Sequence, residues 1–119
     1  MMRTMAVVKQ TGLWDAGPQS VQHMTSRFHF ADGDNWAEVR DNYNFDAPNM
    51  RAMQDDIKRN GIREPIPVDY SQNPPKVVDG HTRLALAERA GLQTVPTVDV
   101  DEFDYNVFGH KELHPTVRR

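Results

Sequence analysis

The sequence predicts an α/β (α+β) protein with a small mixed sheet and flanking helices, on the basis of three observations. Two segments, 48–60 and 81–90, carry the spacing and end signals of helices. Three short segments rich in valine, isoleucine or proline, 65–70, 76–78 and 95–100, are typical of strands. Turn residues separate all of these segments. With 119 residues, the chain has the size of one ordinary domain.

The first predicted helix begins at Pro48, because proline is favoured in the first helical turn. Met50, Met53 and Ile57 follow the spacing of one buried stripe. Gly61 supplies a left-handed stop after the last turn. We therefore expect a helix that buries one face and ends before this glycine.

The second predicted helix follows an Asp-Gly turn, faces the core with Leu84, Ala85 and Ala87, and ends at Gly91. Prolines in the first predicted strand mark either its beginning or the edge of the sheet. Because a helix of about ten residues separates the second and third strands, both belong to one small mixed sheet.

The first 45 residues are an extension that we expect to pack on the recognisable body of the domain, residues 46–119. So short a body has a thin core, and Phe28, Phe30 and Trp36 should therefore be buried against it. Within the extension we expect strands at 5–8 and 26–30, a turn at 31–36 and a short helix at 35–43.

Composition and charge exclude several classes of protein. Lys and Arg total 14, Asp and Glu total 17, and the net charge of −3 argues against a broad DNA-binding surface. A small local basic patch stays open. The chain has no cysteine, which excludes disulfides, cysteine zinc ligands and cysteine nucleophiles. No apolar run approaches the roughly 20 residues that span a membrane, so a cytoplasmic location is the default expectation.

The candidate site is the turn "DGHTR", which begins at Asp79 and joins a predicted strand to a predicted helix. A helix that begins there presents unpaired backbone N–H groups and the positive end of its dipole. Gly80 lets an anion approach the backbone, and Arg83 can fork onto phosphate oxygens. His81 and Thr82 can donate further hydrogen bonds, and Asp79 is a candidate cap. The pattern predicts a phosphate-binding turn.

The same turn also fits an ordinary helix start, in which Thr82 is solvated and Arg83 pairs with Glu64 or Asp79. Both readings stay open at the level of these residues. Arg63 and Glu64 stand at the mouth of the first predicted strand, where an exposed ion pair of little value is one explanation for them.

Three further groups are better explained by structure than by function. A histidine pair in "HKELH" has the spacing of metal ligands, but the flanking glycine and proline leave room for barely one helical turn. An acidic cluster suits Mg²⁺ but also a solvated strand end, and four aromatic residues suit base stacking but also packing. We predict no metal site. The groups are His110 and His114; Asp99, Asp101, Glu102 and Asp104; and Trp14, Phe28, Phe30 and Trp36.

About residues 53–100, with "DIKRNGIREPIPVDY" and "KVVDGHTRLALAERAGLQTVPTVDV", the chain resembles the ParB/sulfiredoxin superfamily, or ParB-like nuclease domain. The shared order is a helix ending in Asn-Gly, a Pro-Ile strand, a strand running into Gly-x-x-Arg, a helix ending in Ala-Gly-Leu and a Val-Pro strand. In that superfamily the turn binds nucleotide phosphates, and Gly80 and Arg83 match its shared glycine and arginine. The resemblance implies a nucleoside triphosphate ligand, CTP as in ParB or ATP as in sulfiredoxins, with or without Mg²⁺.

The chain also departs from the pattern of the superfamily. His81 stands where ParB proteins have glutamate and sulfiredoxins have their catalytic cysteine, which excludes sulfiredoxin activity and argues against CTP hydrolysis. The second nucleotide motif of ParB and its helix-turn-helix are absent from the sequence. Free serine kinases of the superfamily carry an Asp-Gly-His type of turn. In ParB-like domains the corresponding strand edge faces the nucleotide, so the resemblance implies that Arg63 and Glu64 are second-rank site residues.

The resemblance implies a nucleotide- or phosphate-binding protein, with an accessory or regulatory role in DNA metabolism of phage or plasmid type. A first alternative is a small enzyme, kinase-, phosphohydrolase-, NTPase- or nuclease-like, with His81, Asp79 and Glu64 as acid–base groups. A second alternative is a module that binds a protein partner or a second copy of itself beside a vestigial pocket, with contacts from residues 1–45. Direct DNA binding stays open, and no membrane partner is expected.

Overall fold

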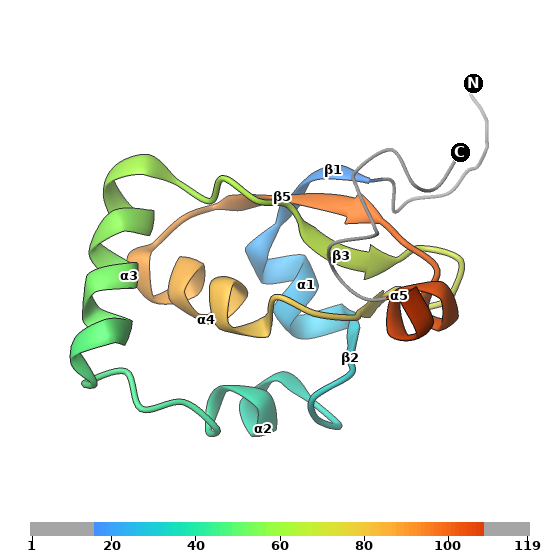
Figure 1. Ribbon diagram of the computed structural model, residues 1–119, viewed down its shortest axis with the longest axis horizontal. Helices are drawn as coiled ribbons and strands as arrows, with labels where there is room; N and C mark the ends of the chain where they lie inside the picture. Colours follow the sequence, from blue (N-terminus) through green and yellow to red (C-terminus); the bar gives the residue numbers. More distant parts are fainter. Residues whose placement is uncertain (1–15, 109–119) are drawn as a thin grey trace.

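The computed structural model describes residues 16–108, which form one five-stranded mixed sheet and five helices (Figure 1). The strand order is β1-β5-β3-β4-β2. The predicted α/β fold class is confirmed. The elements in chain order are β1 (Gly17–Ser20), α1 (Val21–Arg27), β2 (His29–Phe30), α2 (Trp36–Arg40), α3 (Pro48–Asn60), β3 (Ile66–Asp69), β4 (Lys76–Val77), α4 (His81–Ala90), β5 (Thr94–Asp99) and α5 (Glu102–Phe108).

Strand β3 lies at the centre of the sheet, parallel to β5 and antiparallel to β4. The three predicted strands therefore share one sheet, as expected. Pro65 stands just before β3 and marks its beginning, but Pro67 lies inside the strand, opposite Val98. An edge position was thus the wrong alternative. Pro67 has no N–H to donate, yet its carbonyl accepts a hydrogen bond from the N–H of Val78 at 3.0 Å, and this keeps β3 paired.

Helix α4 spans the predicted residues and packs its predicted face into the core. Leu84, Ala85 and Ala87 have no exposed surface, and neither has Leu86. Helix α4 packs on β3 and on α1, and α1 and α4 lie side by side against the sheet (Figure 1). Its start is thereby placed next to the beginning of β3, where the candidate site lies.

Helix α3 also has its predicted bounds but buries less of itself than expected. It packs mainly on α4 and stands at the outer side of that helix, away from the sheet (Figure 1). Of the predicted stripe, Ile57 is buried, Met50 is half-buried and Met53 is 40% exposed. The prediction was wrong for Met53 because a helix with one neighbouring helix buries a narrower face than the spacing suggests.

The first described residues build both edges of the sheet. Strand β1 pairs with β5, and β2 pairs with β4. The strand expected at 26–30 is shorter, because its first residues belong to α1, a helix that begins after a capping Ser20 and was not predicted. The short helix expected at 35–43 ends at Arg40. The strand expected at 5–8 lies outside the described residues.

Aromatic side chains of this first part fill the main core. The predicted burial of Phe28, Phe30 and Trp36 is confirmed, since none of them is more than 6% exposed. The rings of Phe30 and Trp36 lie 5.2 Å apart. Nowhere in residues 16–108 is a helix long and apolar enough to cross a membrane.

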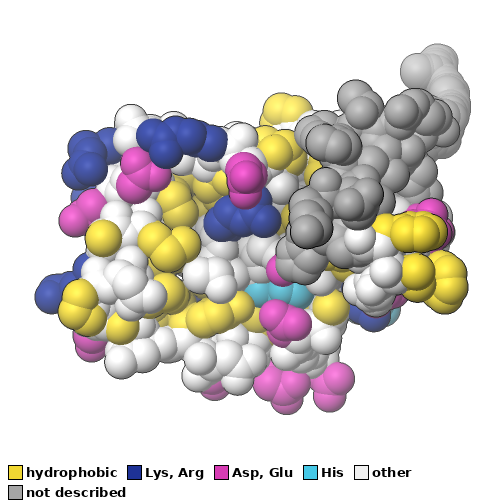
Figure 2. Space-filling view, viewed as in Figure 1, with side chains coloured by type: hydrophobic (Ala, Val, Ile, Leu, Met, Phe, Trp, Pro, Cys, Tyr) yellow, Lys and Arg dark blue, Asp and Glu magenta, His cyan; other side chains and the backbone are white. Residues whose placement is uncertain are grey.

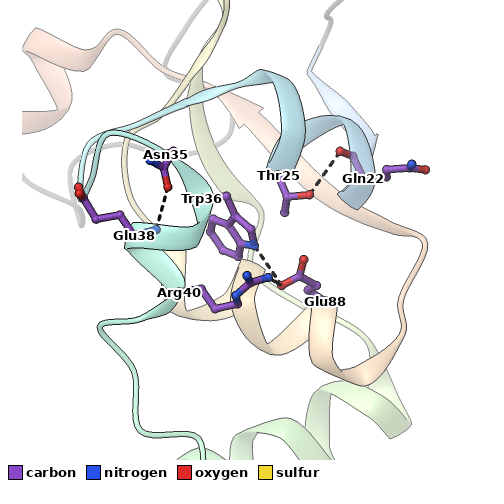
Figure 3. Close-up of polar contacts among 7 residues, drawn as sticks. All are labelled: Gln22, Thr25, Asn35, Trp36, Glu38, Arg40 and Glu88. Atoms are coloured by element: carbon purple, nitrogen blue, oxygen red, sulfur yellow. Dashed lines mark hydrogen bonds and ion pairs between the residues drawn. The ribbon is translucent and has the colours of Figure 1, made fainter.

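A carboxylate near the end of α4 ties α2 to this core (Figure 3). Oε1 of Glu88 accepts a hydrogen bond from Nε1 of Trp36 at 3.0 Å and lies 3.4 Å from Nη1 of Arg40. The bond satisfies the N–H group of a buried indole, which would otherwise be costly. Arg40 is substantially exposed, so its ion pair contributes little to stability.

A matched pair of methionines tests this packing. Met24 in α1 is fully buried, whereas Met53 in α3 is 40% exposed. Met24→Ala should lower the free energy of unfolding by about 2–5 kcal/mol, because it leaves a cavity in the core. Met53→Ala should lower it by less than about 1 kcal/mol. Urea denaturation of both variants measures the difference, and equal small losses would show that α1 does not pack as described.

Candidate functional site

The start of α4 has the backbone conformation of an open anion site. Gly80 precedes the helix in the left-handed region, with φ 78° and ψ 19°, and offers no side chain to cap it. No described residue accepts a hydrogen bond from the backbone N–H groups of His81, Thr82 or Arg83. These donors and the positive end of the helix dipole therefore remain available to a ligand.

Arg83 holds this turn against the beginning of β3. Its Nη1 donates to the backbone carbonyls of Glu64 at 2.6 Å and Pro65 at 3.1 Å. The guanidinium lies across Gly80, where an added Cβ would stand 2.9 Å from Nη2. Gly80 is thus required both for its positive φ and for this close approach. The alternative in which Arg83 pairs with the carboxylate of Glu64 or Asp79 is wrong in its partner, because Arg83 donates to backbone carbonyls instead.

The other donors of this guanidinium stay available. No hydrogen bond from Nε or Nη2 of Arg83 reaches another residue in the described part of the chain. A planar guanidinium can therefore keep two carbonyls on one side and still donate to an anion on the other.

Asp79 crosses the turn instead of capping the helix. Its Oδ1 accepts a hydrogen bond from the N–H of Gly80 at 2.7 Å, and its Oδ2 accepts one from the hydroxyl of Tyr105 in α5, also at 2.7 Å. Asp79 was a candidate cap for an N–H group in the first turn of α4. It accepts from the N–H of Gly80 instead, which lies one residue before the helix, so that prediction is wrong. Burial, and then the carboxylate of Asp79, raise the pKa of the Tyr105 hydroxyl well above its ordinary value.

His81 is the most buried polar residue of the turn, with 2% of its surface exposed. Its Nδ1 lies 3.1 Å from Oδ2 of Asp32, and its ring packs near that of Phe30. Burial lowers the pKa of the imidazole, although Asp32, Asp79 and the carbonyl of Val77 all favour its protonated form. Nε2 is buried and makes no hydrogen bond to the rest of the described chain. The lowered pKa favours the neutral imidazole, in which Asp32 orients one nitrogen and the other has no partner among the described residues.

Asp32 is a site residue that sequence reasoning missed. It lies in the turn before α2, far from His81 in the sequence, and 54% of its side chain is exposed. The local sequence indicates a turn there and nothing more. The contact arises because β2 pairs with β4, which brings the end of β2 beside the start of α4.

The second-rank residues lie along a hollow beside the turn. Arg63, Glu64 and Arg83 line it together with apolar side chains of α3, and its volume is about 360 Å³. Figure 2 shows hydrophobic side chains gathered over α3 and next to it, with charged side chains at the margins. Arg63 pairs with Asp56 of α3 at 3.3 Å, and both are exposed. That is the ion pair of little value given as the alternative for Arg63.

The acidic residues at the end of β5 and after it are engaged with other residues of the fold. Oε2 of Glu102 lies 2.7 Å from Nζ of Lys76, and Oδ1 of Asp101 accepts from the N–H of Asp104. Asp99 accepts from the N–H of Tyr70. Within residues 16–108, no three His, Asp or Glu side chains are grouped so that they hold a metal ion. His110, His114 and Trp14 lie outside the described residues.

Comparison with known proteins finds no relative. No protein-family model matches the sequence. No curated protein and no solved structure matches the chain either. The resemblance to the ParB/sulfiredoxin superfamily therefore rests on the Gly-x-x-Arg turn and on the order of the elements around it.

The lowered pKa of His81 makes the free energy of unfolding depend on pH. The unfolded chain takes up a proton on this imidazole near pH 6.5, and the folded chain does so at lower pH. The free energy of unfolding is therefore highest above pH 6.5 and should fall as the pH decreases through that value. Asp69 and Glu102, whose pKa values are also lowered, lose their contributions at more acidic pH, starting below 4.5.

Chemical denaturation between about pH 7 and pH 5 checks this behaviour. His81→Gln should make the free energy of unfolding nearly independent of pH in this window. His29 is exposed on β2, so His29→Gln serves as the control and should keep the slope of the wild type. A wild-type stability that stays flat in this window would contradict the buried, neutral state of His81.

Proposed function

We propose that the turn at the start of α4 binds the phosphates of a nucleoside triphosphate, CTP or ATP. The single observation that carries the proposal is the guanidinium of Arg83 lying across Gly80 at a helix start whose N–H groups have no cap among the described residues. Backbone N–H groups, a helix dipole and an arginine fork are the usual parts of a phosphate site.

The hollow beside the turn supports a ligand larger than inorganic phosphate. Its volume of about 360 Å³ lies within the range of small-molecule sites. Its walls combine apolar side chains of α3 with Arg63 and Glu64, and Arg83 joins it to the turn. A nucleotide with its phosphates at the start of α4 would have its sugar or base in this hollow. Any Mg²⁺ would come with the triphosphate.

The resemblance to ParB-like domains extends the proposal to a biological setting. We infer an accessory or regulatory protein in DNA metabolism, of phage or plasmid type. If no nucleotide binds, the remaining proposal is a module that binds a protein partner or a second copy of itself.

Substitutions of Arg83 test the phosphate site. Arg83→Ala should weaken binding of CTP or ATP by roughly 1.5–3 kcal/mol, about ten- to a hundredfold, because a charge-assisted and bidentate contact is lost. Arg83→Lys should recover part of the affinity, since it keeps the charge but loses the fork. Isothermal titration calorimetry measures both.

Arg27→Ala is the matched control, because Arg27 is an exposed arginine in the last turn of α1 and does not line the hollow. It should change the affinity less than Arg83→Ala does. Thermal melting must accompany the titrations, since Arg83 also holds two carbonyls in the fold. Equal affinities for the wild type and for a folded Arg83→Ala protein would reduce the turn to a helix start.

A second candidate function is favoured by the pairing of Asp32 with His81. A neutral imidazole oriented at Nδ1 by a carboxylate has the arrangement of a general base. Because Nε2 is buried, this role requires that substrate binding opens the turn far enough for an acceptor hydroxyl to reach that nitrogen. Under this proposal the protein is a kinase- or phosphohydrolase-like enzyme. Asp79 and Glu64 are further acid–base groups near the bound phosphates.

Turnover assays separate this enzyme from a binding protein. With a nucleoside triphosphate and a pool of hydroxyl acceptors, His81→Ala should lower turnover by about 10²–10⁴ while nucleotide affinity persists. Asp32→Asn should lower turnover as well, because the imidazole loses its orienting partner. Loss of affinity in both variants, without any turnover in the wild type, would leave the binding protein as the better description.

A further inference from the structure

The carboxylate of Asp79 occupies a place that an anionic ligand would need. Its Oδ1 lies 2.7 Å from the N–H of Gly80, at the point where the backbone begins to turn into α4. A carboxylate oxygen there accepts the kind of hydrogen bond that a phosphate oxygen would accept. A phosphate group brought to this turn would meet a negative charge at close range, and like charges repel.

A second, independent feature indicates that the turn is incomplete as it stands. Nε2 of His81 is buried and has no hydrogen-bonding partner among the described residues, although burying such an atom unpaired is costly. The carboxylate of Asp79 lies near enough to this imidazole to favour its protonation. His81 directly follows Gly80, so a ligand that replaced Asp79 at Gly80 would bind beside the residue that carries this unpartnered nitrogen.

Tyr105 holds Asp79 in this position. Its hydroxyl donates to Oδ2 at 2.7 Å, and the rest of the side chain is buried with Val78 and Val100 in a small cluster beside the main core. A carboxylate fixed at both oxygens loses less freedom on accepting the Gly80 N–H than a mobile one would.

We propose that Asp79, held by Tyr105, is a built-in competitor of the ligand, which a phosphate group must displace from Gly80 in order to bind. This inference rests on the proposed phosphate site. It means that the protein's own carboxylate inhibits phosphate binding at that site. Displacement of the carboxylate also removes the acceptor of the Tyr105 hydroxyl, so binding at the turn loosens the second half of α5. The first turn of α5 stays attached, because Glu102 contacts Lys76 and Gln72.

The affinity of four variants for pyrophosphate, without Mg²⁺, tests the proposal by calorimetry. Asp79→Asn should bind about ten- to a hundredfold more tightly than the wild type, and Tyr105→Phe about three- to tenfold, since each weakens the competitor. Tyr70→Phe is the matched control, because it removes a tyrosine hydroxyl that bonds Thr97 instead. Asp55→Asn, on the exposed side of α3, controls for the loss of one negative charge. Neither control should change the affinity by more than about twofold.

Hydrogen exchange gives a second reading on the wild type. Saturating pyrophosphate should speed the exchange of the backbone amides at 105–108, while the amides of α4 become slower to exchange. This measurement needs no substitution, so it holds even if Tyr105→Phe fails to fold.

The outcomes separate the two proposals. If neither the wild type nor Asp79→Asn binds pyrophosphate, CTP or ATP, the phosphate site itself is wrong. If the wild type binds, but Asp79→Asn and Tyr105→Phe bind equally well or more weakly, the site stands and the competitor is wrong. Binding by Asp79→Asn alone would be the strongest support, because the wild-type carboxylate would then block the site entirely.

Discussion

The guanidinium of Arg83, laid across Gly80, fixes helix α4 against the central strand of the sheet. It reaches the two carbonyls just before β3, so the start of the helix and the start of the strand are joined by charge-assisted hydrogen bonds. The contact requires a residue without a Cβ in a left-handed conformation at position 80. Helix α4 also packs on α1 and α3, so its position affects both the sheet and the two helices beside it.

Negative side chains outnumber positive ones around the turn. Arg83 supplies the positive charge, with the helix dipole beside it, while Asp32, Asp79 and Glu64 stand around the same few residues. The bare turn is therefore not a strongly positive surface, which agrees with the chain's net charge of −3. Selectivity for a phosphate would come from the direction of the donors and from the hollow, rather than from overall attraction.

Local signals in the sequence predicted the parts of the fold that are determined locally. Helices α3 and α4 have proline or glycine at their ends and apolar spacing within, and their bounds are as expected. Strand β1, "GPQS", has no alternating pattern, and it is a strand because β5 offers it a free edge. Helix α5 lies in a polar stretch and is held by Tyr105, whose partner comes from a distant turn. Such elements depend on contacts that no short window of sequence contains.

The candidate site divides in the same way. Gly80 and Arg83 were found from the sequence, because a glycine before a helix and an arginine in its first turn are local features. Asp32 and Tyr105 were not, since each reaches the turn from another element. The hydrogen bonds from Arg83 to backbone carbonyls could not be predicted either, because every residue has a carbonyl and the sequence does not show which one is used.

The pairing of β1 with β5 has a consequence for folding during translation. Gly17 and Thr97 bond to each other across 80 residues of chain, so the first strand has no partner until nearly all of the described chain has been synthesised. Loop closure of this length is slow compared with helix formation. Helices can form while the nascent chain is still lengthening, but the β1–β5 pair can close only after β5 has been synthesised. Until then the backbone of β1 is open to pairing with other chains.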